Sequence, residues 1–487
     1  MSWAPPERAS LSARGRARIL RQRRRRLVVL LVMVGVAVAA LISALAAGPL
    51  PGPPRAGLAA AAAGGNPFGY APARESEYIA RATAGNAHAL FVKSPGGAVA
   101  TAARVAAYRP LIDRAVAGTG IDPALLEGIV FVESAGRAQV IAGNDPTSAA
   151  GLTQILAQTG QSLLGMHIDL ARSRRLTTAI DGVASGTRRG RLAPLLARRA
   201  AIDDRFNPAK ELAGTVRYLR FAQHQFGRVD LAAESYHMGV GNLHQVLSDY
   251  NGGHAVPYVQ LYFDSAPDNH GTAYRLLAGF GDDSWLYYWR ILGAVSVMRL
   301  YRSDRTALTR LASLQNADSA GAYVLHPPDR TPGFADPSAL SAAYQDRTLV
   351  PLPTNLAALG LAVDPTMGSA AGRLGVPRGL YRGLRPAALK LIVALAARVR
   401  SLAGGAQPLQ ISSTVADHEY QRATGSVVPA AAAGWSFQIA RHYVSAAQAQ
   451  AFQAVLDRLQ ALNLIAWARA GSMIDVTVAA NAAAWLR

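Results

Sequence analysis

The residue with the clearest chemical potential is Glu133, a carboxylic acid that directly follows the apolar run 129–132 (IVFV). Apolar neighbours disfavour the charged form of a carboxyl group and raise its pKa toward neutrality. An acid that is still protonated near pH 7 can donate a proton to the leaving oxygen of a glycosidic bond. Most helical glutamates are solvated surface residues, so this setting alone favours an ordinary surface acid over a catalytic one.

The segment before Glu133 carries the signals of a helix start. Asp122 followed by Pro123 predicts an N-terminus, because the aspartate can accept a hydrogen bond from a free amide and proline fits the first helical position. The other acid of this helix, Glu127, is six positions before Glu133 and therefore about 120° away around the helix axis. We do not expect these two carboxyl groups to form a catalytic pair.

Glu133-Ser134 is the first of four motifs that follow one another between residues 121 and 243. The others are GLTQI at 151–155, RFNP to GTVRYL at 205–219, and AAESYHMGVGN at 232–242. In this order they resemble the soluble lytic transglycosylase family. Its signature is a Glu-Ser pair, then Gly-Leu-(Met/Thr)-Gln-Ile, a Gly-x-x-Tyr-Leu helix and an Ala-Tyr-Asn-Ala-Gly-x-Gly-Asn segment.

The resemblance implies a mainly α, lysozyme-like catalytic domain that acts on the peptidoglycan glycan strands of bacteria. In that family one glutamate, here Glu133, protonates the β-1,4 glycosidic oxygen between N-acetylmuramic acid and N-acetylglucosamine. The same carboxylate then deprotonates the muramyl C6 hydroxyl, which closes a 1,6-anhydro ring. The chemistry requires no cofactor, no metal and no second carboxylate, unlike that of most glycosidases.

The resemblance also implies supporting roles for residues that match the family in the Glu-Ser pair, in the GLTQI motif and in the motif at 232–242. Ser134 would hydrogen-bond near the acid or the substrate, and Gly151 would let the backbone approach the sugar. Gln154 would orient the acetamido group or order the site, and Tyr236 would flank the catalytic cleft. For Gly151 a turn and for Tyr236 a place in the core are equally good interpretations.

A weaker match at 283–288 (DSWLYY) is similar to a helix that closes the cleft in some family members. It makes Asp283 and Tyr287 further candidates for substrate binding. Two departures lie in the last motif, where His237 stands at the family's Asn and Met238 at its Ala. We interpret His237 as a packed or solvated residue with no catalytic role.

The N-terminal segment predicts a membrane anchor. Residues 1–26 contain nine arginines and one acid, Glu7, and residues 27–47 form an uncharged apolar run of 21 residues. As a helix that run would be about 31 Å long, close to the thickness of a bilayer core. The positive-inside rule puts the Arg-rich tail in the cytoplasm and the catalytic domain on the extracytoplasmic side of a single-pass bacterial membrane protein. A signal peptide cleaved after Ala46 is the alternative.

The bulk composition excludes some classes of site. The net charge is +20, but the N-terminal arginines have a topological explanation, so no nucleic-acid partner is expected. Cysteine is absent, which excludes disulfides, thiol catalysis and Cys-ligated zinc. The expected partners are the glycan strands and the membrane.

The composition also divides the exported chain. Residues 48–75 are predicted to be a linker, 76–303 the catalytic domain, and 304–353 a second linker rich in Pro, Asp and Ser. Residues 354–487 are predicted to form a smaller α+β domain. Its predicted helices are at 386–403 and 445–462, and its predicted strands are at 409–413 and 474–478.

The C-terminal domain resembles, faintly, the zinc D-Ala-D-Ala carboxypeptidase-like fold. The positions of that family's metal ligands are occupied here by Ala431, Gln438 and Asp475. Alanine cannot bind zinc and glutamine binds it poorly. We therefore expect a degenerate, metal-free domain that serves as a peptidoglycan-binding or structural module.

Three functions remain open at this point. The first is an active lytic transglycosylase, and the second is a muramidase that admits water and releases a reducing end. The third is a catalytically idle cell-wall-binding scaffold. The intact motifs around Glu133 favour the enzymes, whereas the degenerate C-terminal domain indicates that loss of activity can occur in this chain.

Overall fold

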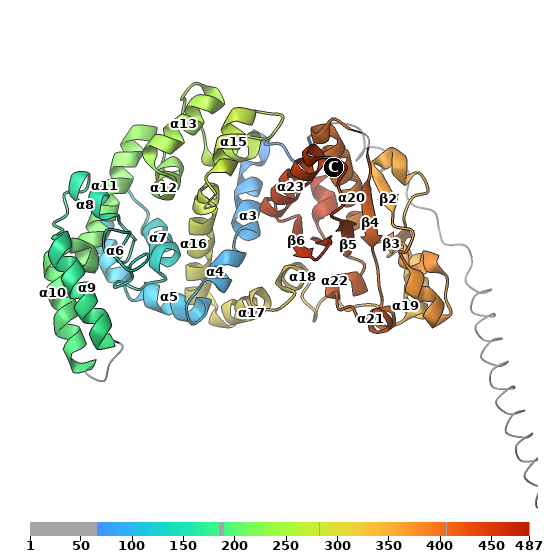
Figure 1. The fold of residues 1–487 in the computed structure, drawn as a ribbon, viewed down its shortest axis with the longest axis horizontal. Helices are drawn as coiled ribbons and strands as arrows, with labels where there is room; N and C mark the ends of the chain where they lie inside the picture. The colour runs from blue at the N-terminus through green and yellow to red at the C-terminus, as the bar shows by residue number, and fades with distance from the viewer. Residues whose placement is uncertain (1–65, 185–188, 282, 406, 487) are drawn as a thin grey trace, which may run out of the picture.

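The computed structural model describes residues 66–184, 189–281, 283–405 and 407–486 of the 487-residue chain. They form a helical part and an α+β part that lie side by side (Figure 1). The helices of the first part are α3 (Glu75–Gly85), α4 (His88–Val92), α5 (Ala98–Ala106), α6 (Arg109–Val116), α7 (Pro123–Ser134), α8 (Ala157–Ser162), α9 (Leu170–Ala184), α10 (Leu192–Ile202), α11 (Pro208–Phe226), α12 (Val229–Met238), α13 (Val240–Asn251), α14 (Tyr258–Asp264), α15 (Gly271–Gly279) and α16 (Tyr287–Ser303).

Helix α7 is the central element of the helical part. It begins as predicted, with Pro123 at its first turn and the Asp122 side chain accepting a hydrogen bond from the Ala124 amide at 2.8 Å. Most of its side chains are buried. At Gly128 an added Cβ would lie 2.9 Å from the Ile291 backbone oxygen, so α7 and α16 are in close contact. The close packing fixes the C-terminal end of α7 against the start of α16.

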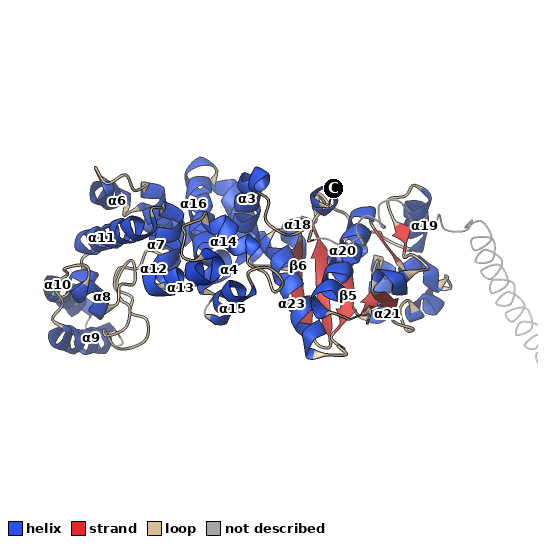
Figure 2. Ribbon diagram, turned by 90° about the horizontal axis from the view of Figure 1, so that it is seen from above, coloured by secondary structure: helices blue, strands red, loops and turns tan. Residues whose placement is uncertain are grey.

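The α+β part is built on a five-stranded sheet in the order β2-β4-β5-β7-β6, in which only β2 and β4 are parallel. Figure 2 shows α20 and α23 in front of this sheet. The elements are β1 (Val350–Pro351), β2 (Leu361–Val363), β3 (Gly383–Leu384), α20 (Pro386–Ala403), β4 (Leu409–Ser413), α21 (His418–Thr424), α22 (Pro429–Ala432), β5 (Ser436–Ala440), α23 (Ala446–Ala461), β6 (Ile465–Ala470), β7 (Met473–Val478) and α24 (Ala482–Trp485). The predicted helices and strands of this part are confirmed.

The two faces of the sheet differ because side chains alternate along each strand. Ile439 pairs with Ile411 on one side and with Ile474 on the other, and all three are buried. The alternate positions carry polar side chains, among them the paired Gln438 and Asp475. The apolar face therefore packs on the helices, and the other face keeps polar groups.

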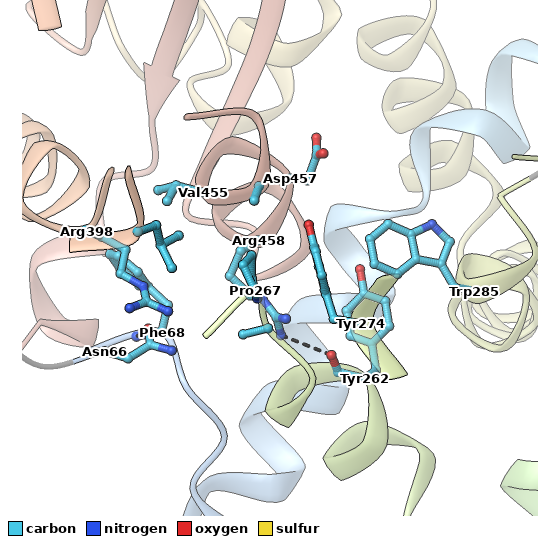
Figure 3. Close-up of a pocket in the computed structure, with 13 residues that line it drawn as sticks. Asn66, Phe68, Tyr262, Pro267, Tyr274, Trp285, Arg398, Val455, Asp457 and Arg458 are labelled. Carbon is cyan, nitrogen blue, oxygen red and sulfur yellow. Dashed lines mark hydrogen bonds between the residues drawn. The ribbon is translucent and has the colours of Figure 1, made fainter. Parts of the chain in front are cut away.

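Charged side chains join the two parts directly. Arg398 of α20 makes two hydrogen bonds of 2.6 Å to Asp268, which lies between α14 and α15. Arg458 of α23 donates to the backbone oxygens of Tyr262 and Ser265 at 3.2 and 2.6 Å. Figure 3 shows this seam, with Arg458 reaching across to Tyr262. Such bidentate and backbone contacts fix an orientation as well as a distance.

The predicted fold class was wrong in placing a transmembrane helix before the catalytic domain. Among the residues that the structure describes, no helix combines the length and the apolar character needed to cross a bilayer. The run at 27–47, on which that prediction rested, lies outside the described residues. What the structure supports is a helical part followed by an α+β part.

The segment 304–353, predicted to be a linker, is instead mostly folded. It contains α17 (Arg305–Gln315), α18 (Ala320–Leu325), α19 (Pro337–Gln345) and β1. The Asp304 side chain accepts a hydrogen bond from the Ala307 amide, and Asp336 caps α19 in the same way. The Asp and Pro residues that suggested a linker are thus helix-start signals, since both residue types are favoured there.

Candidate functional site

Glu133 lies at the C-terminal end of α7, where the close packing on α16 brings it to Tyr287. The Tyr287 hydroxyl donates a hydrogen bond of 2.6 Å to Oε1 of Glu133. Tyr287 is the first residue of α16 and is buried, whereas Glu133 is partly exposed. A fixed phenol therefore holds one carboxyl oxygen of a residue that is partly exposed.

The surroundings of Glu133 make it a weak acid. Burial disfavours its charged form and raises its pKa from 4.5 to about 7, and the hydrogen bond from Tyr287 acts in the opposite direction by stabilising the carboxylate. A carboxyl group with this pKa is about half protonated at neutral pH. It can both give and take a proton there, as a general acid and base must.

Tyr236 connects this carboxyl group to the loop at 151–154. Its ring is nearly parallel to that of Tyr287, with centroids 6.4 Å apart and an interplanar angle of 11°. Its hydroxyl donates to the backbone oxygen of Thr153 at 2.9 Å. The charge of Glu133 is close enough to contribute to the raised pKa of Tyr236, although burial is the larger cause. The motif at 232–242 thus lies beside Glu133-Ser134 and the GLTQI motif at 151–155.

A buried acid, Glu211 of α11, organises the same loop. Its carboxyl oxygens accept hydrogen bonds from the amides of Leu152 and Thr153 at 2.6 and 2.8 Å. They also accept one from the Thr153 hydroxyl at 3.1 Å. Burial raises the pKa of Glu211 to about 8. The motif at 205–219 thereby holds the GLTQI loop in place, and both Glu211 carboxyl oxygens accept hydrogen bonds from that loop.

Arg205 anchors the other side of the loop. It is completely buried and pairs with Asp203, whose Oδ2 lies 2.8 Å from one guanidinium nitrogen. Its guanidinium also donates to the backbone oxygens of Pro146 and Ser148 at 2.8 and 3.1 Å. A buried ion pair with this many satisfied donors fixes the geometry of the segment that precedes the loop.

Three of the predicted site residues have structural contacts. Ser134 is buried and its hydroxyl donates to the Leu152 backbone oxygen at 2.7 Å, so it ties α7 to the loop instead of facing a substrate. Gly151 has φ +91° and makes the turn, with Glu211 directly against it. The Gln154 amide donates to the Gly151 oxygen at 2.8 Å and orders the loop. These contacts give the three residues a scaffolding role, and a contact of Ser134, Gly151 or Gln154 with substrate stays a prediction.

Asp283 and His237 lie at the edge of the cluster. The Asp283 side chain is 56% exposed and makes a 2.7 Å ion pair with Arg290. No described contact joins it to Glu133, so of the two candidates in the weaker motif only Tyr287 bonds to the Glu133 carboxyl group. His237 Nδ1 lies 3.0 Å from the Ser284 hydroxyl, and its ring centroid is 5.1 Å from that of Tyr287.

Sequence reasoning missed the buried acids Glu211 and Glu234. Glu234 of α12 is completely buried and accepts a hydrogen bond from the Tyr288 amide at 2.8 Å, which fixes the first turn of α16 and with it Tyr287. Glu211 lies on the apolar face of its helix, four residues before Thr215. An acid on an apolar helical face is the signal that could have found Glu211, because such an acid needs buried partners.

No family model matches the chain, and no curated protein or solved structure matches it either. Function must therefore be inferred from the chemistry of the site itself.

Replacing Tyr287 with Phe is expected to raise the pKa of Glu133 above 7. The change removes the donor that stabilises the carboxylate and leaves the burial in place. The pKa can be followed by NMR titration of a carbon-13-labelled Glu133 carboxyl group. Tyr236→Phe is the matched control, because its hydroxyl donates to Thr153 and not to Glu133. An unchanged or lowered pKa in Tyr287→Phe would contradict this account.

Proposed function

We propose that the chain is a peptidoglycan lytic transglycosylase that cleaves the β-1,4 bond between N-acetylmuramic acid and N-acetylglucosamine. The observation that carries the proposal is a single partly exposed glutamate, Glu133, with a pKa of about 7 and a buried phenol at 2.6 Å. The four motifs of the family meet around it in space. They are joined by the contacts of Ser134, Tyr236 and Glu211 to one loop.

The proposed reaction uses Glu133 twice. Its acid form donates a proton to the glycosidic oxygen as the bond from that oxygen to the muramyl C1 breaks, and the glucosamine end leaves as a free alcohol. The resulting carboxylate takes the proton of the muramyl C6 hydroxyl while O6 forms a bond to C1. The proton returns to Glu133, the ring closes, and no water is consumed.

The partners of the other acids favour this reaction over hydrolysis. A hydrolase that follows the usual two-carboxylate scheme needs a second carboxylate, either to activate water or to attack C1. Glu211 and Glu234 are fully buried and accept from backbone amides, and Glu127 is ion-paired with Arg302 and Arg109. None of these acids is free to act as a nucleophile. A muramidase is therefore the weaker alternative.

The proposal puts the catalytic part outside the cytoplasm, because its glycan substrate is there. An idle scaffold is disfavoured by the position of Glu133. Unlike the buried acids Glu211 and Glu234, it is partly exposed, and its hydrogen bond comes from a phenol and not from backbone amides.

The products of purified protein acting on sacculi distinguish the three functions. Digestion in water enriched in oxygen-18, followed by mass spectrometry, is expected to give 1,6-anhydro-muramyl ends without the heavy isotope. Reducing muramyl ends that carry oxygen-18 would show a muramidase and overturn the transglycosylase. The absence of any soluble fragment, with intact sacculi still binding the protein, would leave only the scaffold.

A further inference from the structure

A large groove separates the helical part from the edge of the sheet. Its volume is about 490 Å³, and we call it the interdomain groove. His88 of α4 and Gln315 of α17 line one wall, and Trp467 of β6 with Asp475 of β7 line the other. Ligand sites of this size commonly lie between two parts of a protein. None of the contacts around Glu133 involves these residues, so the groove is distinct from the catalytic cluster.

Strand β6 gives the groove an open edge. It is the last strand of the five-stranded sheet, and its described backbone hydrogen bonds within the sheet go to β7 alone. Residues 465–468 line the groove. The outward-facing amides and carbonyls of an edge strand can bond to an extended ligand. Four residues span about 13 Å, which suits a ligand with a few amide bonds better than a long protein strand.

Small side chains lie on the polar face of this edge, and α18 packs against Ala466, since a Cβ added to Gly321 would lie 2.7 Å from the Ala466 Cβ. Ala466 pairs with Thr477 and Ala468 pairs with Asp475, so these four side chains share one face and line the groove. Ala468 is exposed. Trp467 alternates with these two alanines along the strand, pairs with Val476 and therefore lies on the opposite, apolar face.

The groove is acidic in a basic protein. The chain contains 50 Lys and Arg against 30 Asp and Glu, yet the groove is lined by Asp318 and Asp475 and by no described Lys or Arg. Gln438 donates to one Asp475 oxygen, Oδ1, at 2.6 Å. The other oxygen accepts no described hydrogen bond. This arrangement favours a cationic group, such as an ammonium, over a carboxylate or phosphate.

We propose that the interdomain groove binds the stem peptide of peptidoglycan, with the side-chain ammonium of its diamino acid at Asp475 and its amides along β6. The identity of the peptide rests on the proposed function, because the glycan strand carries its stem peptides to the enzyme. Packing between α16 and α4 connects the interdomain groove to the site at Glu133. At Gly293 of α16 an added Cβ would lie 2.8 Å from Leu90 of α4, the helix that carries His88. Helix α16 begins with Tyr287.

Calorimetry of the full chain with a synthetic stem tetrapeptide containing a third-position diamino acid tests the proposal. Acetylation of the side-chain amine is expected to weaken binding at least about tenfold, because it removes the charge that Asp475 pairs with. The Asp475→Asn variant should bind the peptide with the free amine weaker than the wild type does by the same factor. Its affinity for the acetylated peptide should change little. Asp318→Asn is the matched control with a smaller expected effect. Equal affinity for both peptides would overturn the ammonium site.

Hydrogen exchange of backbone amides tests whether the peptide binds along the edge of β6. Binding of the tetrapeptide is expected to slow exchange of the amides of β6, and Ala468→Arg should abolish both binding and protection by filling the groove with a like charge. Protection confined to other elements would overturn the proposed docking along β6.

The same experiments separate this proposal from the proposed function. Cleavage of sacculi without tetrapeptide binding would remove the groove proposal and keep the transglycosylase. Tetrapeptide binding without release of anhydro ends would keep the groove and remove the enzyme.

Discussion

Replacing Glu133 with Gln is expected to lower the rate of release of anhydro-muramyl ends from sacculi by about 10³-fold or more. Glutamine has nearly the same shape and can still accept the hydrogen bond from Tyr287. It can neither donate a proton to the glycosidic oxygen nor remove one from the C6 hydroxyl. General acid–base catalysis is typically worth 10²–10⁴ in rate, and both proton transfers are lost here. The measurement is the initial rate of anhydro-end formation by mass spectrometry.

The same variant should be more stable than the wild type above neutral pH. The pKa of Glu133 is raised from 4.5 in the unfolded chain to about 7, so the folded state binds the proton more tightly. The stability of the wild type therefore falls as pH rises from about 4.5 to 7. The Glu133→Gln variant does not lose this stability, because glutamine does not titrate. The difference in the free energy of unfolding is at most about 3 kcal/mol. A rate loss combined with a higher unfolding midpoint at pH 8 would exclude unfolding as its cause.

Glu127→Gln is the matched control for this experiment. Glu127 lies on the same helix but is buried and ion-paired with Arg302 and Arg109. Removing its charge leaves Arg302 without its described ion-pair partner, although Arg109 keeps Asp113. Stability should therefore fall while the folded fraction keeps its rate. A wild-type rate in Glu133→Gln, or an equal rate loss in both variants, would contradict the assignment of Glu133 as the acid and base.

The sequence contained enough information to select Glu133, Tyr287 and Tyr236 as candidates, but not the contacts that join them. A helix start at Asp122 and an apolar run before the acid are local signals, and they place Glu133 at a helix end. The motif that contains Tyr236 was recognised by its pattern, but its contact with Thr153 depends on how α12 packs. Contacts of this kind arise from tertiary packing, which has no short-range signal.

The buried acids show where sequence reasoning fails for a physical reason. Glu234 looks like an ordinary helical surface residue, since most glutamates are solvated, and only its place on an apolar face distinguishes Glu211. Each accepts at least one hydrogen bond from a backbone amide, which offsets part of the cost of burial. Asp283 was selected by a weak motif; it lies at the surface and pairs with Arg290, and its contact with substrate stays a prediction.

Replacing Gly151 with Ala is expected to cost at least about 3 kcal/mol of stability and to abolish activity in the protein that still folds. Gly151 has φ +91°, a conformation that strains residues with a Cβ. An added Cβ would also overlap the Arg205 backbone oxygen and lie 2.5 and 2.6 Å from the Glu211 carboxyl oxygens. Both neighbours are buried and hydrogen-bonded, so neither can move without breaking the network that holds the loop.

Gly143→Ala separates the two causes, because Gly143 has the same φ of +91° but its nearest atom is 4.0 Å from an added Cβ. Its substitution should cost only the backbone strain, roughly 1–2 kcal/mol. Urea unfolding of both variants measures the difference. Equal losses would mean that the approach of Glu211 to Gly151 does not constrain the loop. A much larger loss of stability at Gly151 would show that this position requires glycine because of its contact with the Glu211 carboxyl group. The glycine of the GLTQI motif would then be required by a buried acid and not by the sugar.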